Sequence, residues 1–362
     1  MTEKIEKNNY FAYANTCYGF VNLFNKIYDS KNLDKIYIIK GCGGADLFNK
    51  IAQKAEEKEY SINSIDYFLC PFDINQLNGI IINDIKTAII KEDLYDSILM
   101  TKYPALIENI INFNNFYDET KLINQKQKIL NLIKYKNKYN NLGYNFLKAA
   151  NELSENITEL SQQYINWEKL DSSVERLINK AVNEKHLQPD NIDKFVFINS
   201  VSTDEYSELD TFENKAKKIF YISNENFTGW YYTKILYEKF KNICKIICPD
   251  ALNPANIKAI YLKELQILFT IKNKKFNKIY DDKYSFINME RFIDKKLKKD
   301  NKQKLKFMYK CYKSIKDESI KYFAESNNIN NIIENIYLYS VTPNNAAKKN
   351  KYIEKTIQRI FQ

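Results

Sequence analysis

The stretch Lys35-Ile-Tyr-Ile-Ile-Lys40, followed directly by Gly41-Cys-Gly-Gly-Ala-Asp-Leu-Phe48, decides the fold. Its first half is a short apolar run, which predicts a buried strand. Its second half is a glycine-rich loop that leads into an amphipathic helix over 47–59. A related strand, Lys218-Ile-Phe-Tyr-Ile-Ser223, follows 183 positions later and leads through a loop into a helix over 231–241. Strand, loop and helix in this order predict an α/β domain, and the recurrence predicts two of them.

Further segments repeat in the same order, which indicates a duplicated chain rather than a chance match. Two short strands end in Cys-Pro, and the segments before and after them also match. The matching pairs are 11–16 with 195–200, 67–71 with 245–249, 79–85 with 259–265, 87–90 with 266–269, and 111–118 with 287–294. We therefore predict two tandem domains, residues 1–188 and 189–362, joined near the turn residues Pro189-Asp190-Asn191.

Each copy is predicted to be a three-layer α/β domain with a parallel sheet and right-handed connections. The sheet-forming part of each copy is followed by a long lysine-rich stretch with heptad-like apolar spacing, over 118–155 and 294–327. These stretches predict long helical-hairpin arms in which helices run antiparallel.

A glycine-rich loop between a strand and a helix is a place where a phosphate binds, because backbone N–H groups converge there. The working pattern is G-x-x-x-x-G-K-[ST], in which lysine reaches the phosphates and the hydroxyl ligates Mg²⁺. In the first copy Gly41 matches, and Gly43 and Gly44 keep the loop rich in glycine. However, Asp46 replaces the second pattern glycine, Leu47 the lysine and Phe48 the hydroxyl.

The second copy reads Asn224-Glu-Asn-Phe-Thr-Gly-Trp-Tyr231, in which Thr228 and Gly229 match the pattern. Trp230 stands in place of the lysine and Tyr231 in place of the hydroxyl. We interpret these rings as filling the phosphate space, with a stacking site for a base as the alternative. The acidic residue that holds Mg²⁺ at the end of a buried strand is missing too, since Lys91 and Thr270 stand there; Glu92 and Asp93 are the nearest substitutes.

Both copies resemble a bacterial family of tandem P-loop ATPase-like proteins, regarded as ATPases or nucleotide kinases of unknown substrate. The resemblance rests on residues 11–41, 70–90 and 102–111 and on the helical arm ending at 147–150. In that family the loop reads like GGPGTGKST in each copy, and this chain departs from it twice.

The resemblance implies a pseudo-ATPase of the P-loop NTPase superfamily, with a Rossmann-like fold, no catalytic residues and nucleotide binding lost or weak. On this reading the scaffold is kept for interaction with a protein partner, and no cofactor is expected. The alternative is a weak or unconventional ATPase that uses ATP and Mg²⁺ through the residual glycines of the first copy.

The balance of lysine and arginine indicates which class of partner to expect. The formal charge is +10, yet only Arg176, Arg291 and Arg359 are arginines, the residue that specific phosphate and base readout favours. Nucleic acid is therefore not the expected partner. The lysine-rich arms, with Tyr135, Tyr139 and Tyr144, could instead meet an acidic partner, with a solvated surface as the alternative.

No run of about 18 apolar residues occurs, and the first ten residues are polar, so we expect no membrane association and a cytoplasmic location. Six scattered cysteines are expected to be reduced thiols. Cys244 and Cys248 are four apart, but with His186 as the one histidine we predict no metal site.

Overall fold

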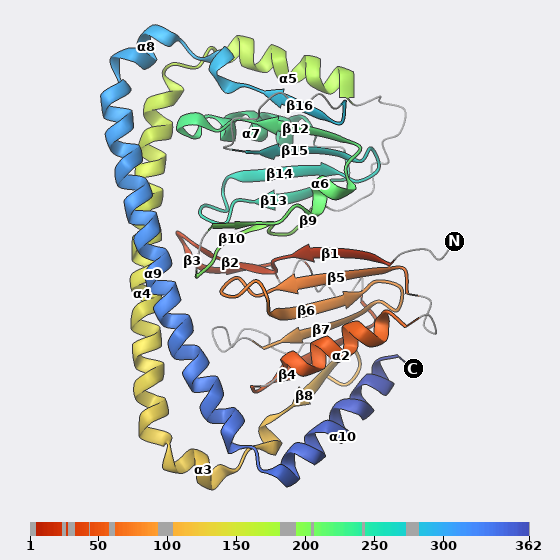
Figure 1. The fold of residues 1–362 in the computed structure, drawn as a ribbon. Helices are drawn as coiled ribbons and strands as arrows, with labels where there is room; N and C mark the ends of the chain where they lie inside the picture. Colours follow the sequence, from red (N-terminus) through yellow and green to blue (C-terminus); the bar gives the residue numbers. More distant parts are fainter. Residues whose placement is uncertain are drawn as a thin grey trace.

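The computed structural model describes residues 5–361 except 24–26, 28–32, 43, 58–61, 93–103, 182–192, 204–205, 241–242 and 273–281. Two six-stranded sheets lie one above the other, and two long helices run along the same side of both (Figure 1). The predicted junction between the copies at 188/189 falls outside the described residues.

The two sheets have the same strand order, which confirms that the chain carries two α/β units of one topology. The first sheet runs β1 (Glu6–Tyr10), β5 (Ser64–Leu69), β6 (Leu77–Ile82), β7 (Thr87–Lys91), β4 (Lys35–Lys40), β8 (Glu108–Asn112). The second runs β9 (Lys194–Phe195), β13 (Ile246–Pro249), β14 (Ile257–Leu262), β15 (Ile267–Ile271), β12 (Lys218–Ile222), β16 (Tyr284–Ile287). The quoted strands β4 and β12 therefore occupy equivalent places, second from one edge.

Strand pairing supports the alignment of β6 with β14, but the matches of 67–71 with 245–249 and of 87–90 with 266–269 are out of register by two residues and by one. Gly79 pairs with Ile90 in the first sheet, and Ala259 pairs with Thr270 in the second, at a common offset of 180. The sheets are mostly parallel, as predicted, with one exception in each: β6 and β14 run antiparallel to both neighbours. The turns 83–86 and 263–266 are far shorter than the dozen or more residues that a parallel crossover needs.

Helices cover mainly one face of each sheet. On the first sheet these are α2 (Ala45–Ala55) and α10 (Pro343–Ile360); on the second they are α7 (Gly229–Lys239) and α5 (Trp167–Ala181). The opposite face of the second sheet carries the short helix α6 (Thr211–Lys215), whose Phe212 packs on Ile219 and Tyr261. A thin third layer is thus present in the second unit.

The long helices pair between the copies rather than within them. After α3 (Glu119–Asn124), the 37-residue helix α4 (Lys126–Gln162) runs antiparallel to α9 (Lys302–Ser340), which follows α8 (Lys295–Asp300) (Figure 1). The predicted antiparallel arms are therefore present, and each arm is one long helix contributed by a different copy. At 1.5 Å per residue α4 spans about 55 Å without a break, so it reaches the second unit instead of folding back.

As a result the two units exchange their last helices. Leu170 and Val174 of α5, which follows α4, are fully buried against the second sheet. Ile353 and Ile357 of α10, which follows α9, are buried against the first sheet. The helices α4 and α5 correspond to α9 and α10 at an offset of 176, so the repeat extends farther than the sequence had indicated.

Both ends of the arm pair are held in the same way. An isolated antiparallel bridge joins Tyr117 to Val341 at one end, and another joins Ile165 to Ile293 at the other. At the offset of 176, Tyr117 corresponds to Ile293 and Ile165 corresponds to Val341, so each copy contributes the same two positions to the two bridges. The arms therefore connect the two units through a repeated, nearly symmetrical contact.

A second connection lies where the sheet edges approach each other. The backbone N–H of Phe11 donates to the carbonyl of Phe197 at 2.9 Å, and Phe197 returns the bond at 3.2 Å. The hairpins β2–β3 (Tyr13–Thr16, Gly19–Asn22) and β10–β11 (Asn199–Val201, Tyr206–Glu208) also meet here, where Asn15 Nδ2 donates to the Val201 carbonyl.

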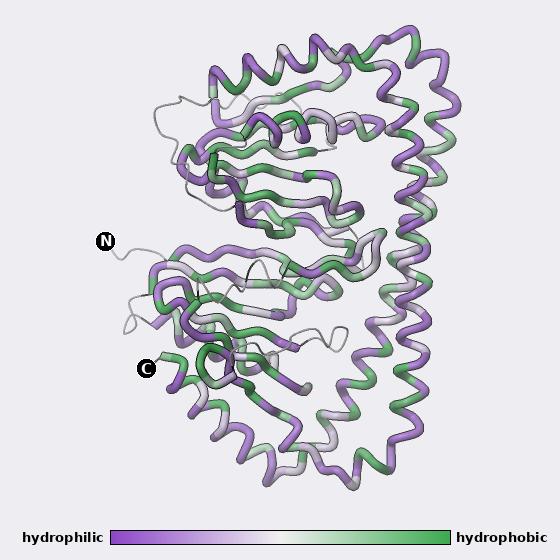
Figure 2. The backbone as a smooth tube through the Cα atoms, turned by 180° about the vertical axis from the view of Figure 1, so that it is seen from behind, coloured by the Kyte–Doolittle hydropathy of each residue, from purple (hydrophilic) through white to green (hydrophobic). Residues whose placement is uncertain are grey.

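Hydropathy follows this arrangement. Figure 2 shows apolar residues concentrated in the strands, whereas apolar and polar turns alternate along the long helices. None of the helices within the described parts of the chain is both long and apolar enough to cross a membrane.

Candidate functional site

The glycine-rich loop of the first copy lies between β4 and α2, at the carboxyl edge of the first sheet, where ligands of α/β folds bind. Gly41 has a φ of +93°, and a Cβ built on it would lie 2.6 Å from Asn114 Oδ1 and 3.0 Å from Tyr117 Oη. Gly44 is the N-cap residue of α2, and Gly43 lies outside the described residues. Close packing of the chain itself therefore requires glycine at 41.

The side chains that replace lysine and hydroxyl in this loop point into the protein. Leu47 and Phe48 are both 0% exposed and belong to the core between α2 and the first sheet. Asp46, by contrast, is exposed at the start of the helix. The Cys42 thiol is buried, which raises its pKa. No side chain of this described segment is placed to reach a phosphate with a positive charge.

The loop of the second copy, residues 223–228, is two residues longer than the loop 41–44, and Asn224 stands at its first pattern glycine. Asn226 and Phe227 adopt left-handed conformations, with φ of +52° and +61°. Thr228 is fully buried, and its hydroxyl donates to the Glu225 carbonyl at 2.8 Å. Gly229 opens α7, and a Cβ there would lie 2.6 Å from the Ser223 carbonyl oxygen.

The backbone N–H of Gly229, the first residue of α7, already has an acceptor. Asn224 is buried, and its Oδ1 accepts from the Gly229 N–H at 2.9 Å. A helix N-terminus attracts anions because its first N–H groups lack partners. Here the chain supplies that partner itself.

Aromatic side chains of the second loop pack on the arms. The ring of Phe227 lies 5.0 Å from that of Tyr312 on α9. Tyr231 packs edge-to-face on Trp167 at 5.0 Å and donates to Gln162 Oε1 at 3.2 Å. Trp230 joins the same clusters. These contacts agree with the predicted aromatic packing at positions 230 and 231.

The positions expected for a magnesium-binding acid carry other contacts. Lys91 Nζ, at the end of β7, lies 3.2 Å from Glu334 Oε1 of α9. Glu92 pairs with Lys40 at 3.2 Å, and Thr270 is buried at the end of β15. Asp93 lies outside the described residues.

A small polar cavity remains at this edge of the first sheet, beneath α9, with a volume of about 30 Å³. A chain of contacts runs along it: Lys91 meets Glu334, Asn330 Nδ2 donates to Glu334 Oε1 at 3.5 Å, and Lys136 Nζ donates to Asn330 Oδ1 at 3.3 Å. The cavity holds a water-sized guest but falls far below the roughly 300–1,000 Å³ of small-molecule sites. Its lining also includes Cys70, Phe72, Asp73, Gln76, Asn78, Asn327 and Asn331.

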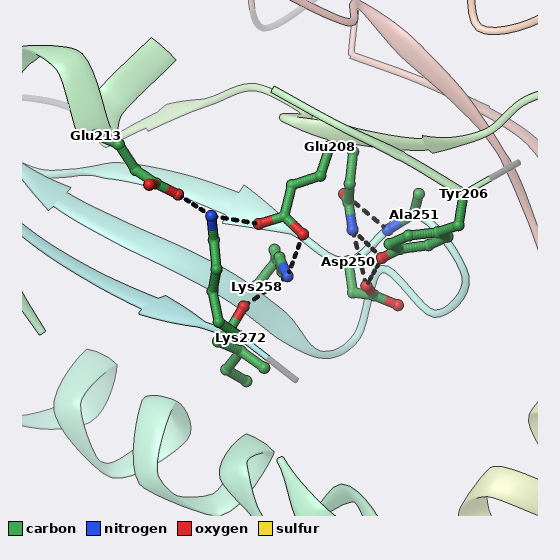
Figure 3. Close-up of polar contacts among 9 residues, drawn as sticks. Tyr206, Glu208, Glu213, Asp250, Ala251, Lys258 and Lys272 are labelled. Atoms are coloured by element: carbon green, nitrogen blue, oxygen red, sulfur yellow. Dashed lines mark hydrogen bonds and ion pairs between the residues drawn. The ribbon is translucent and has the colours of Figure 1, made fainter. Parts of the chain in front are cut away.

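A buried polar cluster stands at the matching edge of the second sheet (Figure 3). Asp250 accepts from Tyr206 Oη at 2.5 Å, from Asn199 Nδ2 at 2.9 Å and from the backbone N–H groups of Leu252 and Asn253. Burial, reinforced by the Asp250 carboxylate, raises the pKa of Tyr206 well above its usual value. Four donors satisfy this carboxylate, so it fixes the hairpin β10–β11 in place.

Lysines adjacent to this cluster are also paired. Lys258 Nζ is buried and donates to Glu208 Oε2 at 3.0 Å and to the Ile271 carbonyl at 2.6 Å (Figure 3). Lys272 contacts Glu213. Among the described residues, no three His, Cys, Asp or Glu side chains gather as metal ligands would.

Comparison with protein-family models, with curated proteins and with solved structures found no match to this chain. The two glycine loops were found from sequence because their pattern is local. The cavity and the Asp250 cluster were not, because each is assembled from segments of both copies or from distant turns. Lys136 and Asn330, for example, are 194 residues apart.

Proposed function

We propose that the protein is a pseudo-ATPase of the P-loop NTPase superfamily that acts as a rigid interaction scaffold. The observation that carries the proposal is the occupied loop of the second copy, where Asn224 Oδ1 takes the Gly229 N–H that a phosphate would need. A phosphate would have to displace a buried amide and leave it unpaired, at a cost of about 1–3 kcal/mol.

The first copy supports the same proposal in a different way. Leu47 and Phe48 are part of the core, so neither can be turned toward a ligand without opening it. The Asp46 carboxylate at the helix start opposes an anion; two like charges at 4 Å repel by about 4 kcal/mol at an effective dielectric constant of 20. Close contact with Asn114 is enough to explain why residue 41 is glycine, so a bound nucleotide is not required to explain it.

The scaffold role rests on how the units are joined. Each unit donates a helix to the other, and the arm pair holds them at both ends, so the relative position of the two sheets is fixed by packing on both sides. A rigid two-unit body with its phosphate loops filled is suited to presenting surfaces to a partner.

Isothermal titration calorimetry with ATP and Mg²⁺ tests the pseudo-ATPase proposal. We expect no saturable heat, and no hydrolysis above background. Saturable ATP binding or turnover in the parent protein would overturn the proposal.

A further inference from the structure

Lys316, in the middle of α9, packs its ammonium group against tyrosine rings. Its Nζ lies 5.2 Å from the ring centre of Tyr206 on β11 and 5.8 Å from that of Tyr312 on its own helix. Within the described parts of the chain, no carboxylate or carbonyl oxygen forms an ion pair or a hydrogen bond with this nitrogen. The two rings therefore stand where water or an acid normally surrounds an ammonium group.

Other buried lysines of the second unit have oxygen partners. Lys245 Nζ lies 3.1 Å from Asp193 Oδ1, and Lys258 Nζ lies 3.0 Å from Glu208 Oε2. An opposite charge at such a distance favours the protonated form of a lysine and offsets the effect of burial. Lys316 has no such partner among the residues that the structure describes.

The charged groups nearest to Lys316 do not replace that partner. The Asp250 carboxylate accepts its hydrogen bonds from Tyr206 and other donors instead (Figure 3). Burial lowers the pKa of Lys316 below its usual value, and Lys313, a like charge one turn earlier, adds to the shift. Attraction to Asp317 and Asp250 opposes the shift without cancelling it. A larger share of Lys316 is therefore neutral amine near pH 7–8 than of an exposed lysine.

Lys316 combines this amine with access from solvent. Its side chain is half-buried rather than sealed in the core. A neutral amine is a nucleophile, whereas an ammonium group has no free electron pair. At the offset of 176 the corresponding residue of α4 is the buried Asn140, so the repeat itself does not require a lysine here.

We propose that Lys316 is an acylation site for small acyl donors of the thioester class. The amine nitrogen attacks the thioester carbonyl carbon, an amide C–N bond forms, the C–S bond breaks, and the thiol leaves with the proton that the amine gives up. The product is neutral, so the cation between Tyr206 and Tyr312 is lost. Acylation thus acts on the contact of α9 with the hairpin β10–β11, and it does not depend on the pseudo-ATPase proposal.

The test compares Lys316 with Lys313 in the full chain treated with N,S-diacetylcysteamine. This small thioester is uncharged, so the lysine-rich surface does not steer it. Lys313 is exposed on the same helix and reports the reactivity of an ordinary lysine. Mass spectrometry follows acetylation of each lysine from pH 6.5 to pH 10. At pH 7.5 Lys316 is expected to react at least about threefold faster, and its rate should level off at a lower pH.

The same measurement in guanidinium chloride ties the difference to the folded structure. Unfolding exposes both side chains, so Lys316 and Lys313 should then react at equal rates. The proposal is overturned if folded Lys316 reacts no faster than Lys313, if the two rates level off at the same pH, or if the difference persists in the unfolded chain.

A pair of substitutions tests the consequence for the arm. Lys316→Gln replaces the cation by a neutral amide, as acylation does, whereas Lys316→Arg keeps the charge over the rings. Hydrogen exchange at the amides of β10 and β11 should become at least about threefold faster in Lys316→Gln and stay unchanged in Lys316→Arg. Equal exchange in both variants overturns the assigned effect on the contact of α9 with the hairpin.

Discussion

Gly143→Ala probes the close approach of the two arms, where two opposing effects can be weighed. Gly143 lies in the middle of α4, and a Cβ there would lie 2.7 Å from Phe323 Cε1 and 2.9 Å from Cζ. The Phe323 ring cannot move aside easily, because it is fully buried and packs edge-to-face on Tyr144 at 5.2 Å and on Phe72 at 6.1 Å.

Helix propensity alone would make the substitution stabilising. Alanine is favoured over glycine in a helix interior by about 1 kcal/mol. Overpacking a filled core costs about 1–3 kcal/mol, and contacts under 3 Å with a confined ring belong to the upper part of that range. We therefore expect Gly143→Ala to lower the free energy of unfolding by about 1–2 kcal/mol.

Urea denaturation followed by circular dichroism measures this change. Phe323→Leu removes the ring atoms that the new methyl group would strike, so the double variant should lose less than the two single losses added together. The coupling is expected to be at least about 0.5 kcal/mol. If Gly143→Ala is as stable as the parent protein or more stable, the arms are not packed as closely as described and the reasoning fails.

Three further predictions concern the exchanged helices, the filled loop and a buried thiol. Removing residues 343–362 should increase hydrogen exchange at the amides of β4 and β8 and leave those of β12 protected, because Ile353 and Ile357 cover only the first sheet. An equal loss of protection in both sheets would contradict the assignment of α10 to the first sheet. Asn224→Ala should cost about 1–3 kcal/mol in urea denaturation, because the Gly229 N–H loses its acceptor; an unchanged midpoint refutes this, and Asn224→Asp, which keeps an acceptor, is the control. Burial raises the pKa of Cys17 to about 11, so little of its thiol is the reactive thiolate at pH 8. The rate of Cys17 alkylation, measured by mass spectrometry, should therefore rise about tenfold per pH unit up to that pKa. If Cys17 reacts at pH 8 as fast as an exposed cysteine does, the thiol is not buried.

The sequence predicted the repeat and most of the strands because both are local signals. The runs at 35–40 and 218–223 are apolar over one strand length, and the structure places them as β4 and β12 in equivalent positions. Register followed for β6 and β14, where Gly79 and Ala259 were matched by sequence, but the matches for β5 with β13 and for β7 with β15 were displaced by two residues and by one. A hydrophobic pattern of period two or 3.6 needs no knowledge of distant residues.

The loops were located by sequence but not explained by it. The sequence alone shows that Leu47 and Trp230 stand at the lysine position of the pattern, since residue identity can be read directly. That Asn224 caps the Gly229 N–H could not be read, because it depends on a left-handed backbone at Asn226 that is rare outside glycine.

What the sequence by itself determined is therefore the α/β class, the duplication and the absence of lysine from the pattern position in both loops. Only the tertiary structure decided which sheet each long helix serves. A helical pattern specifies which face of α4 is apolar, but it does not specify which helix packs on that face. In the structure that helix is α9 of the other copy. The exchange of α5 and α10 and the cavity beneath α9 follow from that choice, because packing between distant segments is settled by fit and burial rather than by local pattern.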